Sequence, residues 1–133
     1  MPEIIGHVDA RNRPLVSFSI PGHEDGVLGL VDTGFNGYVL MHRDVAKRFG
    51  FAVTDITIMV EFAGHPRREV YVAGGRIAWF NQIVDVDVLV TTEERPRNIL
   101  SDEPVALIGT GLLNPHKLVV DFANRRVLIA QNE

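Results

Sequence analysis

The chain has 133 residues, of which 46% are hydrophobic and 23% charged, and these proportions are typical of one soluble domain spanning residues 1–133. The absence of cysteine excludes thiol catalysis, disulfide frameworks and cysteine-based zinc sites. The net charge of −4 and the scattering of the 13 lysine and arginine residues argue against a nucleic-acid partner.

The N-terminal segment Met1–His7 lacks the basic stretch and the following apolar stretch of a secretory signal. No run along the chain approaches the roughly 20 apolar residues that a membrane-spanning helix needs. We therefore expect a cytoplasmic protein with no membrane partner.

Short β-branched and aliphatic runs separated by Gly, Pro, Asn and Asp predict an all-β fold of many short strands. The predicted strands are Leu15–Ile20, Val27–Val31, Gly37–Met41, Ile56–Phe62, Glu69–Phe80, Ile83–Val90, Val105–Ile108, Leu118–Phe122 and Val127–Ala130. Residues 43–49 have the pattern of a helix that ends at Gly50, and residues 111–113 predict a second short helical turn before Pro115. The polar residues 91–104 are predicted to form a surface loop.

The sequence Asp32-Thr33-Gly34 follows the hydrophobic strand Val27–Val31 and precedes the turn-forming pair Asn36-Gly37. An aspartate at the end of a buried strand is partly desolvated, so its proton affinity is sensitive to its neighbours. Taken alone, the tripeptide more often marks a structural turn, in which the aspartate accepts hydrogen bonds from nearby backbone amides.

A second motif near the C-terminus changes this interpretation. Leu107-Ile108-Gly109 is a hydrophobic pair followed by glycine, Leu112-Leu113 follow as a short helix, and the strand Leu118–Phe122 closes the segment. The order and spacing of the two motifs over residues 14–130 resemble those of the retropepsin-like aspartic proteases. This resemblance implies a closed β-barrel with a flap hairpin and one or two short helices, and it implies that Asp32, Thr33 and Gly34 are the catalytic residues.

In that family a glycine-containing hairpin, the flap, folds over bound substrate. The segment Ile58–Val72 has two strand-like arms around a turn that contains Gly64, which fits the role. A plain exposed hairpin is the alternative. The substrate-binding residues that the resemblance implies are Phe62, Ala63, Gly64 and His65 above the substrate, and Leu30, Val105 and Ile108 in the apolar floor.

Metal-free hydrolysis of a peptide bond requires a general base for the water and a general acid for the carbonyl oxygen. Two aspartates about 3 Å apart can share one proton and fill both roles. Asp32 is the only aspartate of the chain that Thr-Gly or Ser-Gly follows, so a second chain must supply the partner.

A C2 homodimer meets this requirement, because it places equivalent residues face to face near its axis. By resemblance, Thr33 would hydrogen-bond across the axis, and Gly34 would let its backbone amide approach the carboxylates. The β-prone terminal segments Ile4–Val8 and Val127–Ala130 are candidates for an intersubunit sheet.

Three other patterns carry less weight. Gly109-x-Gly111 has no third small residue and Pro115 stops the helix, which argues against a dinucleotide site. The five histidines show no metal-ligand spacing. Alternation places Asp85 and Asp87 on the solvated face of a strand. No metal and no cofactor are expected.

The sequence therefore favours an aspartic endopeptidase that binds an extended peptide as an added strand and cleaves it with a water activated by two Asp32 carboxylates. The alternative is a retropepsin-fold dimerisation or peptide-binding module with little or no proteolysis, because an intact Asp-Thr-Gly does not by itself establish turnover. A peptidase that acts only on itself or on a fused or neighbouring protein is a third hypothesis.

Overall fold

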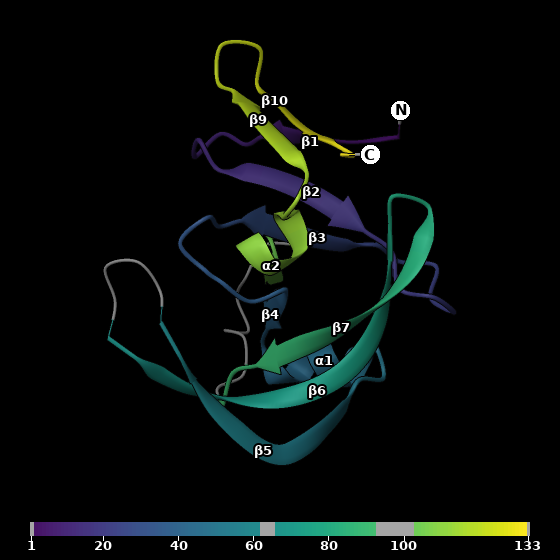
Figure 1. The fold of residues 1–133 in the computed structure, drawn as a ribbon, viewed down its shortest axis with the longest axis vertical. Coiled ribbons are helices and arrows are strands. Elements are labelled where there is room, and N and C mark those ends of the chain that lie inside the picture. Colours follow the sequence, from purple (N-terminus) through teal and green to yellow (C-terminus); the bar gives the residue numbers. More distant parts are fainter. Residues whose placement is uncertain (1, 62–65, 93–102, 133) are drawn as a thin grey trace.

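The computed structural model of the chain describes residues 2–61, 66–92 and 103–132, and Figure 1 shows their arrangement. This part contains ten strands and two short helices. The strands are β1 (Glu3–Val8), β2 (Pro14–Phe18), β3 (Val27–Val31), β4 (Val39–Met41), β5 (Ala52–Val60), β6 (Arg68–Trp79), β7 (Gln82–Val90), β8 (Ala106–Ile108), β9 (Lys117–Asp121) and β10 (Arg126–Ala130). The helices are α1 (Arg43–Arg48) and α2 (Thr110–Leu113). The predicted all-β fold with one or two short helices is confirmed.

The described strands form one sheet in the order β5-β6-β7-β4-β8-β3-β2-β1-β10-β9. The pairs β3–β8 and β4–β7 are parallel, and the other neighbours are antiparallel. Within the described residues the sheet ends at β5 and β9, so the closed barrel that we expected is not confirmed. A sheet of this many twisted strands curls, and the curl brings Ala78 of β6 to a single bridge with Ser19 without forming a ladder.

Alternation decides which side chains of a strand are buried. In β7, Val86 and Val88 are buried, whereas Asp85 and Asp87 lie on the exposed face, as the pattern predicted. The strand then becomes wholly buried at its end, where it pairs with β4. A main core cluster fills the fold, and a smaller one consists of Phe35, Leu40, Val70 and Leu89.

Helix α1 follows β4 and buries Val45 and Ala46. Gly50, with φ of +76°, follows it in the left-handed region that favours glycine, which agrees with the predicted helix end. Among the residues described, no helix has the length and apolar character needed to cross a membrane.

Strand β5 begins at Ala52 rather than at the predicted Ile56. The register between β5 and β6 shifts between Val53 and Thr57, and the Thr54 hydroxyl donates a hydrogen bond of 2.7 Å to the carbonyl of Val72. This irregularity keeps the polar pair Thr54-Asp55 in the strand, which the hydrophobic pattern alone did not indicate.

The two terminal strands pair with each other inside the chain. Glu3–His7 is antiparallel to Arg126–Ala130, and the end of β1 also pairs with the start of β2. Strand β10 lies between β1 and β9, with Val127 and Ile129 fully buried. In the part described, β9 therefore has no neighbouring strand on its outer edge, and the first residues of β1 have none on the β2 side, whereas β10 has one on each side.

Candidate active site

Asp32 lies at the start of a tight turn directly after β3. Its backbone N–H donates to the carbonyl of Ile108 at 2.9 Å, so the pairing of β3 with β8 continues one residue beyond the strand. The Asp32 Oδ1 accepts a hydrogen bond of 2.9 Å from the Gly34 N–H, and the Asp32 carbonyl accepts one of 3.2 Å from the Phe35 N–H. The carboxylate is half-buried and Thr33 is exposed. Residues 32–38 are named the Asp loop below.

The second sequence motif lies directly against the Asp loop. Three consecutive backbone amides at the start of α2 donate hydrogen bonds to carbonyls of the loop: Gly109 to Tyr38 (3.0 Å), Thr110 to Phe35 (2.8 Å) and Gly111 to Gly37 (3.1 Å). A Cβ atom on Gly109 would lie 2.2 Å from the carbonyl oxygen of Gly37. Glycine is therefore required at position 109, because the two backbones approach too closely for a side chain.

The buried side chain of Phe35 anchors the Asp loop to the core. Its side chain is 1% exposed and belongs to the small core cluster with Leu40, Val70 and Leu89. The ring also fills the space beside Gly37, where an added Cβ would lie 2.5 Å from it. The sequence does not assign this residue a role, although a single aromatic side chain in a polar turn is a signal for such an anchor.

A hollow of ≈ 480 Å³ separates the Asp loop from the part of the β5–β6 hairpin where β5 ends and β6 begins. Its lining residues are Phe35, Asn36, Gly37, Ile58, Met59, Val60, Glu61, Arg67 and Leu89. The structure thus brings the Asp loop and the arms of the predicted flap to one cavity. The predicted substrate-covering residues Phe62, Ala63, Gly64 and His65 lie outside the described residues.

A second hollow of ≈ 280 Å³, the apolar pocket, opens beside the strands that carry the two motifs. Its lining residues are Arg13, Leu30, Leu40, Met41, His42, Arg68, Thr91, Glu103, Pro104, Val105, Ala106 and Leu107. Leu30 pairs in register with Leu107, and alternation along β3 places Leu30 on the same sheet face as Asp32.

The predicted floor residues therefore divide between two environments. Leu30 and Val105 line the apolar pocket. Ile108 is fully buried in the main core, where its side chain occupies the space beside Gly29. Neighbouring residues of a strand point to opposite faces, so Leu107 faces the pocket and Ile108 faces the core.

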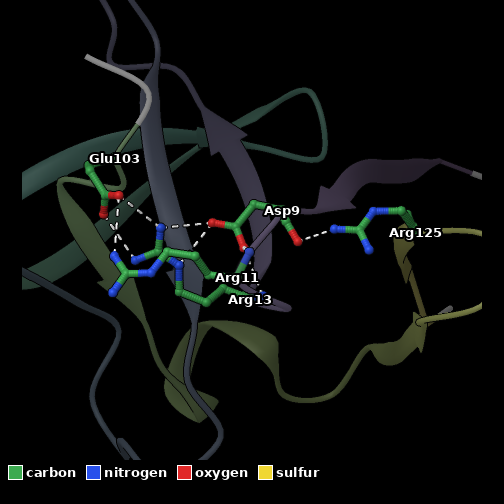
Figure 2. A network of polar contacts seen from close by, with 5 residues as sticks. All are labelled: Asp9, Arg11, Arg13, Glu103 and Arg125. Carbon is green, nitrogen blue, oxygen red and sulfur yellow. Dashed lines mark hydrogen bonds and ion pairs between the residues drawn. The ribbon is translucent and has the colours of Figure 1, made fainter. Parts of the chain in front are cut away.

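Figure 2 shows a network of charged side chains, of which Arg13 and Glu103 line the apolar pocket. The Arg13 guanidinium donates to Glu103 at 3.0 and 3.1 Å and to Asp9 at 2.9 Å. Arg11 lies 3.5 Å from Glu103, and Arg125 donates to the carbonyl of Asp9. Hydrogen bonding to Arg13 lowers the pKa of Asp9 to about 2 and holds the pKa of Glu103 below its usual value. The same bonds raise the pKa of Arg13.

Across residues 2–61, 66–92 and 103–132, no three His, Asp or Glu side chains come together in a way that could hold a metal ion. The arrangement instead offers one half-exposed carboxylate on a loop held by backbone hydrogen bonds, with Phe35, Asn36 and Gly37 of that loop lining the first hollow and Leu30 lining the second. A single carboxylate can act as a general base or as a general acid, but not as both in one step.

No protein-family model matches the sequence, and no curated protein resembles it significantly. Among solved structures, the crystal structure of a retropepsin-like aspartic protease from Rickettsia conorii matches with a TM-score of 0.64. The match covers 96% of this chain and 89% of that chain at 14% sequence identity. The chain therefore has a retropepsin-like aspartic protease fold.

Proposed function

We propose that the protein is an aspartic endopeptidase whose active form is a homodimer. The observation that carries the proposal is the position of Asp32: a half-exposed carboxylate on a loop that three amides of the Gly109–Gly111 segment hold in place, in a retropepsin-like fold. Preorganised placement of a proton-transferring group is what acid–base catalysis requires. The flap and the dimer that complete a retropepsin-like site are parts of the proposal.

In the proposed reaction, two Asp32 carboxylates share one proton. The ionised carboxylate accepts a proton from a water, whose oxygen bonds to the peptide carbonyl carbon, while the protonated one donates to the carbonyl oxygen. The tetrahedral diol then returns a hydroxyl proton to one carboxylate, the peptide nitrogen takes a proton from the other, and the C–N bond breaks. No cofactor takes part.

The two hollows suit an extended peptide, because alternate side chains of a strand point in opposite directions. In the proposal, the substrate peptide runs between the Asp loop and the hairpin. One of its side chains lies in the hollow against Ile58 and Met59, and another lies in the apolar pocket. The exposed apolar side chains Ile5, Val119 and Phe122 on or beside the terminal strands support association of two copies near that end.

The test compares the parent protein with Asp32→Asn on a mixed peptide library from pH 3 to 8. Loss of the dyad should lower cleavage by about 10³-fold or more, since acid–base groups each supply about 10² to 10⁴. Asp87→Asn, the same substitution at an exposed aspartate of β7, is the matched control and should retain full activity. Equal cleavage by the parent and Asp32→Asn would refute the assignment.

The homodimer has a separate test. Adding Asp32→Asn protein to a fixed amount of parent should inhibit it as subunits exchange, because a mixed dimer has one aspartate only. Activity that stays constant while sizing shows exchange contradicts the shared dyad. A dimeric parent that binds a statine peptide but cleaves nothing supports the alternative, a retropepsin-fold peptide-binding module.

A further inference from the structure

Arg13 links two segments that lie 90 residues apart in the sequence at the edge of the apolar pocket (Figure 2). Its two terminal nitrogens form a fork with both oxygens of Glu103, at 3.0 and 3.1 Å. Its Nε donates to Asp9 at 2.9 Å. Forked bonds between guanidinium and carboxylate fix the orientation of both groups as well as their distance.

The Asp9 end of this network is fixed to the backbone. The Asp9 carboxylate accepts hydrogen bonds from the backbone N–H groups of Arg11 and Arg13 at 3.0 and 2.9 Å, which closes the turn between β1 and β2. The Arg13 guanidinium is therefore held at a defined position before it reaches Glu103. Asp9 thus holds Arg13 in place, and Arg13 in turn positions the Glu103 carboxylate.

The network is also sheltered from water. The side chains of Arg13, Asp9 and Glu103 are 24%, 17% and 23% exposed. The Arg76–Asp85 pair on the β6–β7 hairpin has a similar distance of 3.0 Å, but its side chains are 71% and 84% exposed. Screening by water and salt weakens the exposed pair much more than the sheltered one.

Glu103 directly precedes one wall of the apolar pocket. The segment from Pro104 to Leu107 lines this pocket, and its backbone first joins the sheet where the Val105 N–H donates to the carbonyl of Leu28 at 2.9 Å. The fork from Arg13 holds the chain two residues earlier. Leu40 and Met41 of the neighbouring strand β4 also line the pocket, and they pair in register with Leu107 and Ala106, so the sheet fixes the spacing there. Glu103 and Pro104 line the pocket before this pairing begins, so the position of Glu103 affects the width of the pocket at that end.

We propose that Arg13 is a positioning residue that acts through Glu103 to hold the Glu103–Val105 end of the wall, and so keeps the apolar pocket at the width that binds a large apolar side chain of the substrate. The inference rests on the proposed function, because it takes the pocket as part of the peptide-binding cleft. It adds a specificity determinant that lies outside the Asp loop and the hairpin.

The experiment uses full-length Glu103→Ala and Glu103→Gln, because Asp9 also closes a turn and its loss would confound folding. Asp85→Ala, which removes the exposed Arg76 pair, is the matched control. Each protein cleaves peptides that differ only in one residue beside the cleaved bond, changed through Ala, Leu and Phe. We expect Glu103→Ala to lower kcat/KM roughly tenfold for the preferred large side chain, mainly through KM, and less than about twofold for Ala.

The positioning role is tested by comparing how far kcat/KM falls for each of the three substrates. The kcat/KM of Glu103→Gln for the large side chain should lie between those of the parent and Glu103→Ala. Amide hydrogen exchange at Val105, where the segment joins the sheet, should rise in the order parent, Gln, Ala. A uniform fall of kcat/KM for all substrates, or an unchanged profile, overturns the positioning role while leaving the protease proposal intact. A parent that cleaves no peptide at any pH overturns the proposed function instead, and with it the link between pocket and substrate.

Discussion

The Asp loop and strand β5 face each other across the hollow of ≈ 480 Å³, and the fold holds them in opposite ways. The Asp loop receives three backbone hydrogen bonds from residues 109–111 and buries Phe35 to 1% exposure. Strand β5 has no buried residue and pairs only with β6 among the strands described. Its Ile56 and Met59 are 63% and 56% exposed.

This difference separates two requirements of the proposed site. Proton transfer needs a carboxylate in a fixed place, which buried packing and backbone hydrogen bonds provide. A cover that admits a peptide needs a segment with low local stability, and few buried contacts give it that property. The same sheet supplies both, because β3 and β8 lie at its centre and β5 lies at its edge.

The largest expected effect comes from Phe35→Ala. Removing a fully buried aromatic ring should lower the free energy of unfolding by about 3 to 5 kcal/mol. Met59→Ala, on β5, should change it by less than about 0.5 kcal/mol, because the side chain is exposed. Urea unfolding of both variants measures the contrast. Similar losses at the two positions would show that β5 is as firmly packed as the Asp loop.

Gly109→Ala is expected to have the next largest effect. Its Cβ would lie 2.2 Å from the Gly37 carbonyl oxygen, and overpacking of this kind costs about 1 to 3 kcal/mol. Any Gly109→Ala protein that folds should also lose peptide cleavage, since the Asp loop must move. Gly74→Ala is the control, because no heavy atom beyond its two chain neighbours lies within 4 Å of its Cβ position. Full activity and stability of Gly109→Ala would mean that the close contact between residues 109–111 and the Asp loop is dispensable.

The smallest expected effect concerns charge and acid. The lowered pKa values of Asp9 and Glu103 mean that folding favours their ionised forms. Their contribution to stability is therefore present above the ordinary carboxyl values of 3.8 and 4.5. The contribution of Asp9 is lost as the pH falls toward about 2, and that of Glu103 is lost as the pH falls through its lowered pKa. In urea unfolding, Asp9→Asn should lose less stability than the parent between pH 5 and 2.

The control for this titration is Glu61→Gln, which removes the ion pair with Arg67 beside β5. The two side chains are 63% and 69% exposed, so the variant should match the parent at pH 7 within about 0.5 kcal/mol. If acid lowers the free energy of unfolding of Asp9→Asn as much as that of the parent, the Arg13 network beside Leu30 is not sheltered.

Much of the fold could be predicted from local patterns. The strand before Asp32 is predictable as a short hydrophobic run, and the strand around Asp85 from its alternation. Helix α1 is predictable because Gly50 follows a basic last turn. The start of β5 was missed because its first residues are polar and include a register shift. The closed barrel came from the family resemblance, whereas the described sheet remains open.

The candidate site was predictable in part. Asp32 and Gly109 were recognised from their neighbours in sequence, and the structure places them on segments that hydrogen-bond to each other. The burial of Phe35 and of Ile108 could not be predicted in this way. It depends on which face each side chain takes once β3 and β8 pair in parallel. The Arg13–Glu103 fork joins residues in two loops without periodicity, so no pattern indicated it.

The sequence by itself determined the local features: short strands, an aspartate at the end of a buried strand, and a glycine that ends a helix. The tertiary structure decided the partners, namely that β3 pairs with β8, that β1 pairs with β10, and that Glu103 reaches Arg13. The physical reason is range. Alternation and turn chemistry act over a few residues, whereas strand order and the pairing of distant charges depend on how the whole curved sheet buries its apolar face.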